Sequence, residues 1–143
     1  MNVYEKKIGR FFRFEFTNGE DILALLSGFA REKGIREASL LIVGAMQEGE
    51  AVTGFKNLNG GPFDSELEKF KKREFLGLGN LIWPEKPPKS MVRKGVSWDE
   101  PQPYPHFHFA AGPQLGEKER GNLVGHLEKG LASGVTVLLY ELI

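Results

Sequence analysis

Residues 8–16 read Ile-Gly-Arg-Phe-Phe-Arg-Phe-Glu-Phe, and this stretch decides the fold because its pattern is typical of one kind of element. From Phe12 to Phe16, aromatic side chains alternate with charged ones. Such period-two alternation predicts a strand with one buried and one solvated face. The turn residues Thr17-Asn18-Gly19 end the strand. Asn18 is the predicted N-cap of a helix that follows.

An amphipathic helix is predicted directly after this strand. Its apolar residues recur with i, i+3, i+4 and i+7 spacing: Ile22, Leu25, Leu26 and Phe29. This spacing places them on one helix face. Glu20 and Asp21 supply negative charge near the helix N-terminus, where the dipole favours it. Gly34 is the predicted end of the helix.

Further hydrophobic stretches predict more strands. Residues 38–46 contain the run Leu-Leu-Ile-Val and are predicted to form a strand buried on both faces. Residues 51–55 are a predicted hairpin partner, and residues 57–62 have the composition of a turn. The other predicted strands are 68–78, 106–110 and 135–142. About six or seven strands and one main helix indicate an α+β fold with a mainly antiparallel sheet.

Residues 82–105 are predicted to form a long proline-rich loop. Six of the eight prolines lie between Pro84 and Pro105. Proline donates no ladder hydrogen bond, so this stretch cannot be a central strand. Long loops in compact domains are often functional. Trp83, Trp98 and Tyr104 are therefore predicted to form the lid or wall of a site.

Composition predicts a single domain over residues 1–143. A chain of 143 residues and 16.0 kDa is too short for two independent cores. The 19 basic and 19 acidic side chains balance, so no overall charge recruits nucleic acid or an anionic membrane. The absence of cysteine excludes disulfides, thiolate metal sites and cysteine nucleophiles.

Composition also predicts where the protein resides. The first seven residues contain no apolar segment typical of a signal peptide, and no stretch approaches the roughly 18 apolar residues of a membrane span. Together with the absence of cysteine, this predicts a soluble cytoplasmic protein with no membrane partner. High charge without cysteine is also compatible with a thermophilic source.

The three histidines of the chain, His106, His108 and His126, are the candidate metal ligands. Residues two apart on a strand project from one face, roughly 6.6 Å apart. His106 and His108 could therefore bind one metal ion, with His126 contributed by a glycine-flanked turn. Three protein ligands with a free fourth position are typical of catalytic zinc. In the alternative interpretation, the His-x-His pair is only the polar face of a strand.

A zinc enzyme also needs a carboxylate near its imidazoles. Glu128 and Glu141 are the candidate catalytic residues. The alternative for Glu141, which lies inside an apolar strand, is an outward-facing or paired carboxylate.

The segment 69–94 is strongly basic, with eight basic residues against Glu74 and Glu85. The candidate contacts for nucleic acid or another anion stand at its start: Lys69, Lys71, Lys72 and Arg73. Such a cluster can bind a phosphate backbone. The alternative is the solvated face of a strand, where lysines oppose aggregation.

Five motifs in order resemble a known family. They are Gly19-Glu20-Asp21-Ile22, Leu41-Ile42-Val43-Gly44-Ala45, residues 74–80, His106-Phe107-His108 and Gly125-His126-Leu127. From about residue 8 to the C-terminus, the chain resembles the plant- and prokaryote-conserved (PPC, DUF296) domain. Two features depart from the family pattern. Val124 replaces a glycine, and the loop 82–105 is longer than usual.

The resemblance implies a strongly bent antiparallel sheet, related to the acetolactate-decarboxylase-like fold, and a homotrimer. Because members of that related fold bind zinc through three histidines, it also implies zinc binding by His106, His108 and His126. The AT-hook core Arg-Gly-Arg-Pro is absent, so minor-groove binding is not implied.

Three functions follow from these patterns. We expect a stand-alone PPC-domain homotrimer that acts as a regulatory or assembly module, with DNA binding as a further, untested activity. The alternative is a zinc-dependent lyase or hydrolase that acts on a small oxygen-rich substrate through the three histidines. The third is nucleic-acid binding through the segment 69–94.

Overall fold

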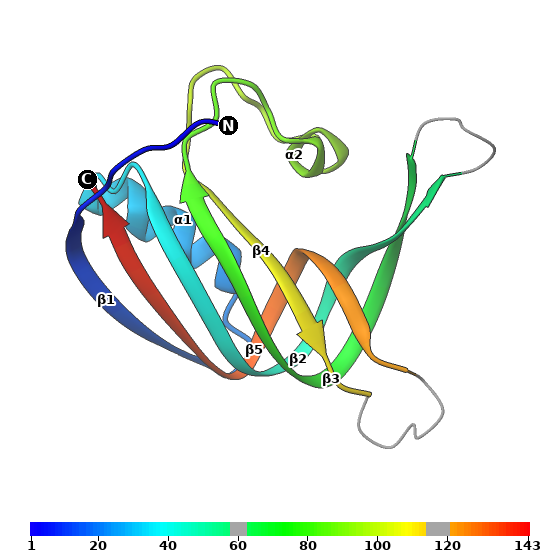
Figure 1. The fold of residues 1–143 in the computed structure, drawn as a ribbon. Coiled ribbons are helices and arrows are strands. Elements are labelled where there is room, and N and C mark those ends of the chain that lie inside the picture. Colours follow the sequence, from blue (N-terminus) through cyan, green and yellow to red (C-terminus); the bar gives the residue numbers. More distant parts are fainter. Residues whose placement is uncertain (58–62, 114–120) are drawn as a thin grey trace.

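The computed structural model describes residues 1–57, 63–113 and 121–143. In chain order the elements are β1 (Ile8–Thr17), α1 (Ile22–Lys33), β2 (Ala38–Asn57), β3 (Phe63–Ile82), α2 (Lys89–Arg93), β4 (Tyr104–Ala111) and β5 (Leu123–Leu142) (Figure 1). None of the helices in these ranges has the length and apolar character to cross a membrane. The α+β prediction is confirmed.

The strands form one antiparallel sheet in the order β1-β5-β2-β3-β4, and β4 also pairs with β5. Strands β2, β3, β4 and β5 therefore close into a ring. The three longest strands, β2, β3 and β5, each have 20 residues and curve sharply, as Figure 1 shows. The predicted strongly bent sheet with one main helix is confirmed.

Within residues 1–57, 63–113 and 121–143, the chain forms fewer and longer strands than the six or seven predicted. Residues 38–46 and 51–55 were predicted as separate strands, but both belong to β2. Register shifts near Met46 and Ala51 let β2 and β5 remain paired through the bend. Of the predicted turn 57–62, Asn57 ends β2 and the rest lies outside the described residues.

Helix α1 begins and ends with clear caps. The side chain of Asp21 accepts a hydrogen bond of 3.1 Å from the main-chain N–H of Ala24. The predicted cap Asn18 was wrong, because Asn18 has φ 49° and forms the preceding turn. Gly34 ends the helix in the left-handed conformation, as predicted.

Helix α1 packs on the sheet through part of its predicted apolar face. The ring of Phe29 makes edge-to-face contacts with Phe12 and Phe14 of β1, with centroids 5.0 and 4.8 Å apart. The buried residues of the helix are Ile22, Leu26 and Ala30. Leu25, predicted to face the core, is 46% exposed.

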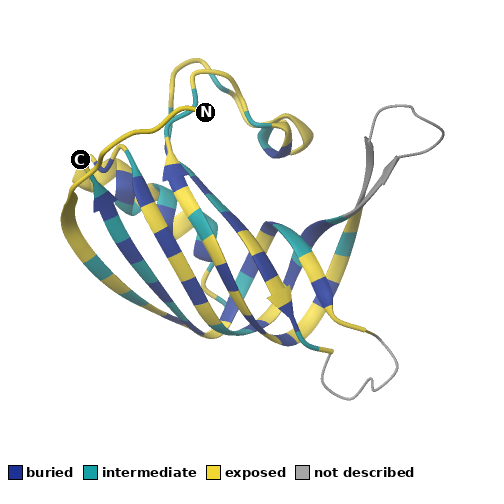
Figure 2. Ribbon diagram, in the orientation of Figure 1, coloured by how far each residue is buried: buried dark blue, intermediate teal, exposed yellow. Residues whose placement is uncertain are grey.

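The first part of β2 is buried on one face only, contrary to the prediction for residues 38–46. Leu40 and Ile42 are in the core, whereas Leu41 and Val43 are exposed. The alternation of buried and exposed residues along the strands is visible in Figure 2. We call the exposed large side chains here the outer apolar face: Leu41, Val43, Leu76, Leu78 and Val124.

The predicted loop contains the short helix α2 and is held to the rest of the protein. We call residues 83–103 the α2 segment. The indole N–H of Trp98 donates to the carbonyl of Pro84 at 3.0 Å, which closes the segment on itself. The hydroxyl of Ser27 in α1 donates to the carbonyl of Pro103 at 3.1 Å. The α2 segment therefore has a defined position beside α1.

Candidate metal centre

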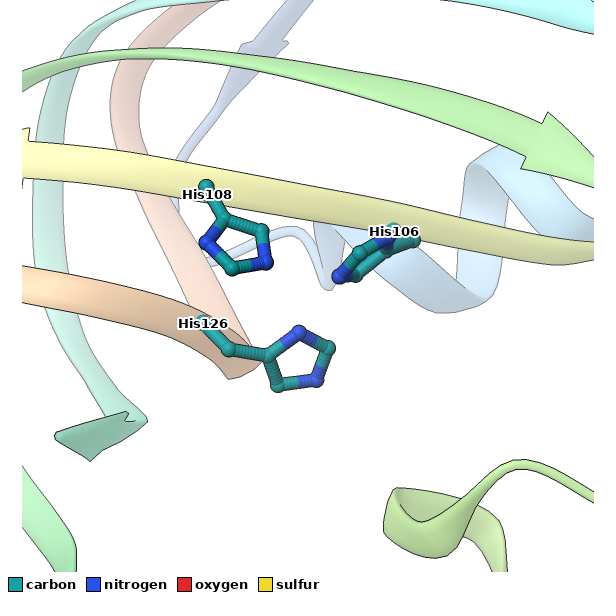
Figure 3. Close-up of side chains that lie close together, drawn as sticks. All are labelled: His106, His108 and His126. Atoms are coloured by element: carbon teal, nitrogen blue, oxygen red, sulfur yellow. The ribbon is translucent and has the colours of Figure 1, made fainter. Parts of the chain in front are cut away.

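Strands β4 and β5 bring the three histidines together. His108 is the register partner of His126, and His106 lies two residues before His108 on the same strand. One ring nitrogen from each residue lies within 4.8 Å of the others. Figure 3 shows the three rings turned toward a common space. His126 was predicted on a turn, but it is a residue of β5.

The alternation of β4 explains why its histidines are available. Phe107 and Phe109 are buried in the core, so His106 and His108 project from the opposite face. On the neighbouring strand, Gly79 leaves room for β4, because a Cβ there would lie 2.0 Å from the carbonyl oxygen of His106. Packing of the phenylalanines thus sets the direction of the imidazoles.

The environment keeps the imidazoles of His106 and His126 neutral. Burial, together with the smaller effects of His106 and His108, lowers the pKa of His126 to about 4. Burial, followed by the effect of His108, also lowers the pKa of His106. Both rings are therefore uncharged at neutral pH, which is the form that binds a metal ion.

The three imidazoles fit a zinc ion in chemistry and approximate geometry. Zinc–nitrogen distances of about 2.0–2.1 Å place the ligand nitrogens of a tetrahedral site roughly 3.3 Å apart. The ligand nitrogens of the three histidines lie within 4.8 Å of one another, so they would move closer together to hold an ion. Three histidines would leave a fourth position free for water or substrate.

Glu128 is brought beside the histidines, as the catalytic hypothesis required. Its Oε1 lies 3.5 Å from Nε2 of His126. The register of β2 against β5 shifts at this residue, because Glu50 pairs with Lys129 and Ala51 with Leu127. Glu128 is thus the extra residue of a β-bulge, a feature that redirects a side chain.

Two cations of the α2 segment contact Glu128. Arg93 donates to its carboxylate, and Lys94 donates to its main-chain carbonyl. The Glu128 side chain is 3% exposed, whereas that of Arg93 is 43% exposed. Sequence reasoning did not assign these cations to the site, because the contact joins residues far apart in the chain.

Glu141 is not brought to the histidines. It pairs with Ala38 at the start of β2, whereas His126 pairs with Val52 near the other end. Arg10 of β1 binds both carboxylate oxygens of Glu141, at 2.6 and 2.8 Å. These bonds lower the pKa of Glu141 to about 2. Glu141 is a paired carboxylate that links β1 to β5.

The four basic candidates do not form one surface. Lys69 lies opposite Glu50, and Lys71 lies opposite Glu48 on β2. Arg73 is buried and donates to the carbonyl of Gly112 at 2.6 Å. Lys72 is exposed. Acidic neighbours and burial thus reduce the positive charge that the sequence concentrates here.

Of the three aromatic residues predicted to form a lid or wall, Tyr104 and Trp98 line a cavity and Trp83 does not. The ring of Tyr104 stacks on His106, with centroids 5.9 Å apart, and its hydroxyl lies 2.8 Å from that of Ser90. Trp98 lines a cavity of about 530 Å3 together with Tyr104 and Glu128. Trp83 instead donates to the carbonyl of Ile35 at 2.7 Å.

Comparisons with known proteins agree with this fold. The model of the Plants and Prokaryotes Conserved (PCC) domain family matches residues 3–143. No curated protein matches the chain.

Solved structures with this fold include archaeal and bacterial proteins. A PPC protein of Pyrococcus horikoshii has a TM-score of 0.71 at 20% identity, over 100% of this chain and 85% of its own. The metal-containing protein AF0104 of Archaeoglobus fulgidus has a TM-score of 0.71 at 21% identity, over 99% and 86%. A protein of Bacteroides thetaiotaomicron described as a candidate DNA-binding protein has a TM-score of 0.61 at 25% identity, over 98% and 84%.

A more distant similarity concerns the fold alone. Acetolactate decarboxylase of Bacillus subtilis has a TM-score of 0.52 at 14% identity, over 95% of this chain and 53% of its own. The predicted relation to the acetolactate-decarboxylase-like fold is confirmed.

Proposed function

The chain belongs to the Plants and Prokaryotes Conserved (PCC) domain family, and we propose that within this family it is a metal-binding protein that holds one divalent ion between His106, His108 and His126. The observation that carries the proposal is the convergence of the three imidazoles, whose ligand nitrogens lie within 4.8 Å of one another. Three nitrogen donors without thiolates suit zinc. The metal-containing description of the structurally similar Archaeoglobus protein supports it.

The residues around the proposed ion suit a zinc-dependent lyase or hydrolase that acts on a small oxygen-rich substrate. A bound ion supplies a Lewis acid that polarises a carbonyl or activates water. Glu128 can hold His126 in one orientation or accept a proton at Oε1. Burial raises the pKa of Tyr104, so its hydroxyl stays protonated and can donate to a substrate oxygen.

Metal analysis of untagged protein after zinc loading and dialysis tests the proposal. We expect about one zinc ion per chain and a large loss of zinc in His108→Ala, because removal of one of three ligands greatly weakens a site. Asn80→Ala is the matched control, since Asn80 is the register partner of His106 but supplies no imidazole. Less than a tenth of an equivalent, unchanged by His108→Ala, would overturn the proposal.

A second proposed function is assembly as a homotrimer that serves as a regulatory or assembly module. The outer apolar face supports it, because its five members are each between 45% and 65% exposed. Leu41 pairs with Leu78, and Val43 with Leu76, so these side chains form a continuous patch across β2 and β3. Large exposed apolar patches mark interaction surfaces in soluble proteins.

Sedimentation velocity at micromolar concentration tests the assembly. We expect a trimer for the wild type and dissociation of the double variant Leu41→Glu/Leu78→Glu, because charges on the patch oppose its burial. Leu25→Glu is the control, since Leu25 is about as exposed as Leu41 but lies on α1. A stable wild-type monomer would contradict the assembly proposal.

We do not extend the proposal to nucleic acid. The Bacteroides neighbour is described as a candidate DNA-binding protein. In this chain, however, Lys69 and Lys71 face Glu50 and Glu48 across the sheet. Cross-strand pairs of opposite charge weaken the positive potential that a phosphate backbone requires.

A further inference from the structure

Strand β1 lies at one edge of the sheet and pairs with β5 on one side only. Figure 1 shows it as the outermost strand, and among the described residues no other strand pairs with its free side. A free edge of this kind can pair with another strand, and native proteins often block such pairing with lysine or proline. Neither residue type occurs in Ile8–Thr17. The free side of β1 is therefore a candidate interaction surface.

The main-chain groups that face this free side belong to the odd-numbered residues. The N–H of Thr17 donates to Oε1 of Glu20 at 2.8 Å, so it does not point toward β5. Alternate residues of a strand direct their main-chain groups to the same side, and the register of β1 is regular from Phe11 to Thr17. Arg13 and Glu15 therefore direct their N–H and C=O groups outward, where a further strand can bond to them.

The side chains of Arg13 and Glu15 carry opposite charges two residues apart. They are 66% and 54% exposed, and they contact each other within the chain at 2.6 Å. When a second copy of β1 lies antiparallel with Phe14 opposite Phe14, each Arg13 faces Glu15 of the other copy. Sliding the strands by two residues instead places Arg13 opposite Arg13 or Glu15 opposite Glu15, and like charges repel each other. The charges thus favour one register of self-pairing.

The same register aligns the aromatic residues of the two strands. Phe14 faces its own copy and Phe12 faces Phe16, on the side of the sheet where Phe29 of α1 contacts β1. Phe12 and Phe14 are only partly buried within one chain. Cross-strand aromatic pairs and pairs of opposite charge both stabilise a sheet. The β1 edge is therefore complementary to a second copy of itself.

We propose that two copies of this chain associate through their β1 edges, antiparallel and with Phe14 at the two-fold axis. The contact joins two sheets into one and places two Arg13–Glu15 pairs between the copies. It goes beyond the assembly proposed above, because the outer apolar face lies on β2, β3 and β5. A contact made by one short strand is small, so we expect association at submillimolar rather than micromolar concentration.

Exchange of charges between the copies tests the inference by sedimentation velocity at submillimolar concentration. The background is Leu41→Glu/Leu78→Glu, so that the outer apolar face does not contribute. Arg13→Glu or Glu15→Arg alone should weaken dimerisation at least about tenfold, because each places like charges opposite each other. An equimolar mixture of the two should dimerise like the background, because opposite charges then face each other again. Lys72→Glu is the control, since Lys72 is exposed on β3, away from the edge.

Cysteine variants test the register independently, because the chain contains no other cysteine. In the otherwise wild-type chain, Arg13→Cys mixed with Glu15→Cys should form a disulfide-linked dimer on oxidation, since residues of a hydrogen-bonded pair have Cα atoms about 5.5 Å apart. Each variant alone should cross-link much less.

Two results would overturn the inference. One is a mixture of the charge variants that dimerises no better than either variant alone. The other is a mixture of the cysteine variants that cross-links no more than either variant alone. The absence of a wild-type trimer at micromolar concentration would contradict the assembly proposal but not this inference.

Discussion

Gly79 shows how a single residue controls the metal centre from the neighbouring strand. A Cβ at this position would lie 2.0 Å from the carbonyl oxygen of His106 and 2.9 Å from the ring of Phe107. Main-chain atoms on a paired strand cannot move away without breaking the ladder. The absence of a side chain at Gly79 is therefore what allows β4 to pair with β3 at the level of His106.

We predict that Gly79→Ala lowers the free energy of unfolding by about 2 kcal/mol, because it overpacks a closely paired region. Urea denaturation measures the change. Gly134→Ala is the control, since a Cβ at Gly134 would have no atom within 4 Å. Equal stability of the two variants would show that β4 does not depend on the close approach at Gly79.

Glu141 illustrates a residue whose charge stabilises the fold rather than the site. Its pKa is lowered to about 2 from 4.5, chiefly by the hydrogen bond from Arg10. Between these values the unfolded chain binds the proton more readily than the folded chain. The stabilisation by the ion pair is therefore complete above pH 4.5 and is lost as the pH falls toward 2.

We predict that Glu141→Gln lowers the melting temperature by a few degrees at pH 7 and that this difference shrinks as the pH falls below about 4.5. Thermal unfolding followed by circular dichroism at several pH values checks it. Glu5→Gln is the control for an exposed carboxylate, since Glu5 is exposed near the N-terminus. A difference between wild type and Glu141→Gln that stays constant down to pH 2.5 would contradict the role of the pair.

Local sequence patterns predicted which face of a strand a side chain occupies. They did not predict which residues from other parts of the chain it contacts. The alternation of Phe12, Phe14 and Phe16 predicted a half-buried strand, and each of these rings is at least partly buried. The spacing of His106 and His108 likewise predicted a shared face. The contacts of Arg93 and Arg10 with their glutamates could not be predicted, because they join residues 35 and 131 positions apart.

At the scale of elements, the structure differs from the sequence-based expectation mainly in strand length. The surroundings of each long strand change along its length. Its sequence therefore shows two short hydrophobic patterns, which predict two separate strands. In β5, Leu123–Leu142, the bulge at Glu128 interrupts the period-two alternation. The strand predicted from the sequence covered only residues 135–142, and the glycines at 121 and 125 led to the prediction that His126 lies on a turn. The helix was easier to predict, because amphipathic spacing and the terminal Gly34 are local signals, although its N-cap is Asp21 and not the predicted Asn18.

Helix α1 offers a direct test of local propensity. Gly28 is exposed in the middle of α1, and a Cβ there would meet no atom within 4 Å. We predict that Gly28→Ala raises the free energy of unfolding by about 0.5–1 kcal/mol, because alanine loses less backbone entropy than glycine in a helix. Urea denaturation measures it, with zinc content unchanged as the control. Destabilisation would show that Gly28 has a contact that the structure does not describe.

At the scale of the whole molecule, the closed ring of β2, β3, β4 and β5 is what creates the candidate metal centre. β4 pairs with β3 along its length and with β5 over residues 108–111. The second pairing is the one that sets His126 beside His108. The unfolded chain cannot hold these imidazoles in one place, since they come from strands that pair only in the folded protein.

Zinc should therefore stabilise the whole fold. A ligand that binds only the native state adds about 2.7 kcal/mol at one hundred times its dissociation constant, which corresponds to a rise in melting temperature of roughly 5–10 °C for a chain of this size. We predict this rise for the wild type in scanning calorimetry with added zinc, and its reversal by a chelator. His126→Ala should abolish the rise, because His126 is the proposed zinc ligand on β5 and lies opposite His108 of β4. Asn80→Ala should preserve the rise, because Asn80 lies opposite His106 but supplies no imidazole. An equal rise in the melting temperature of the wild type and of His126→Ala would show that zinc binds at another site. The closed ring of strands would then not be what creates the zinc site.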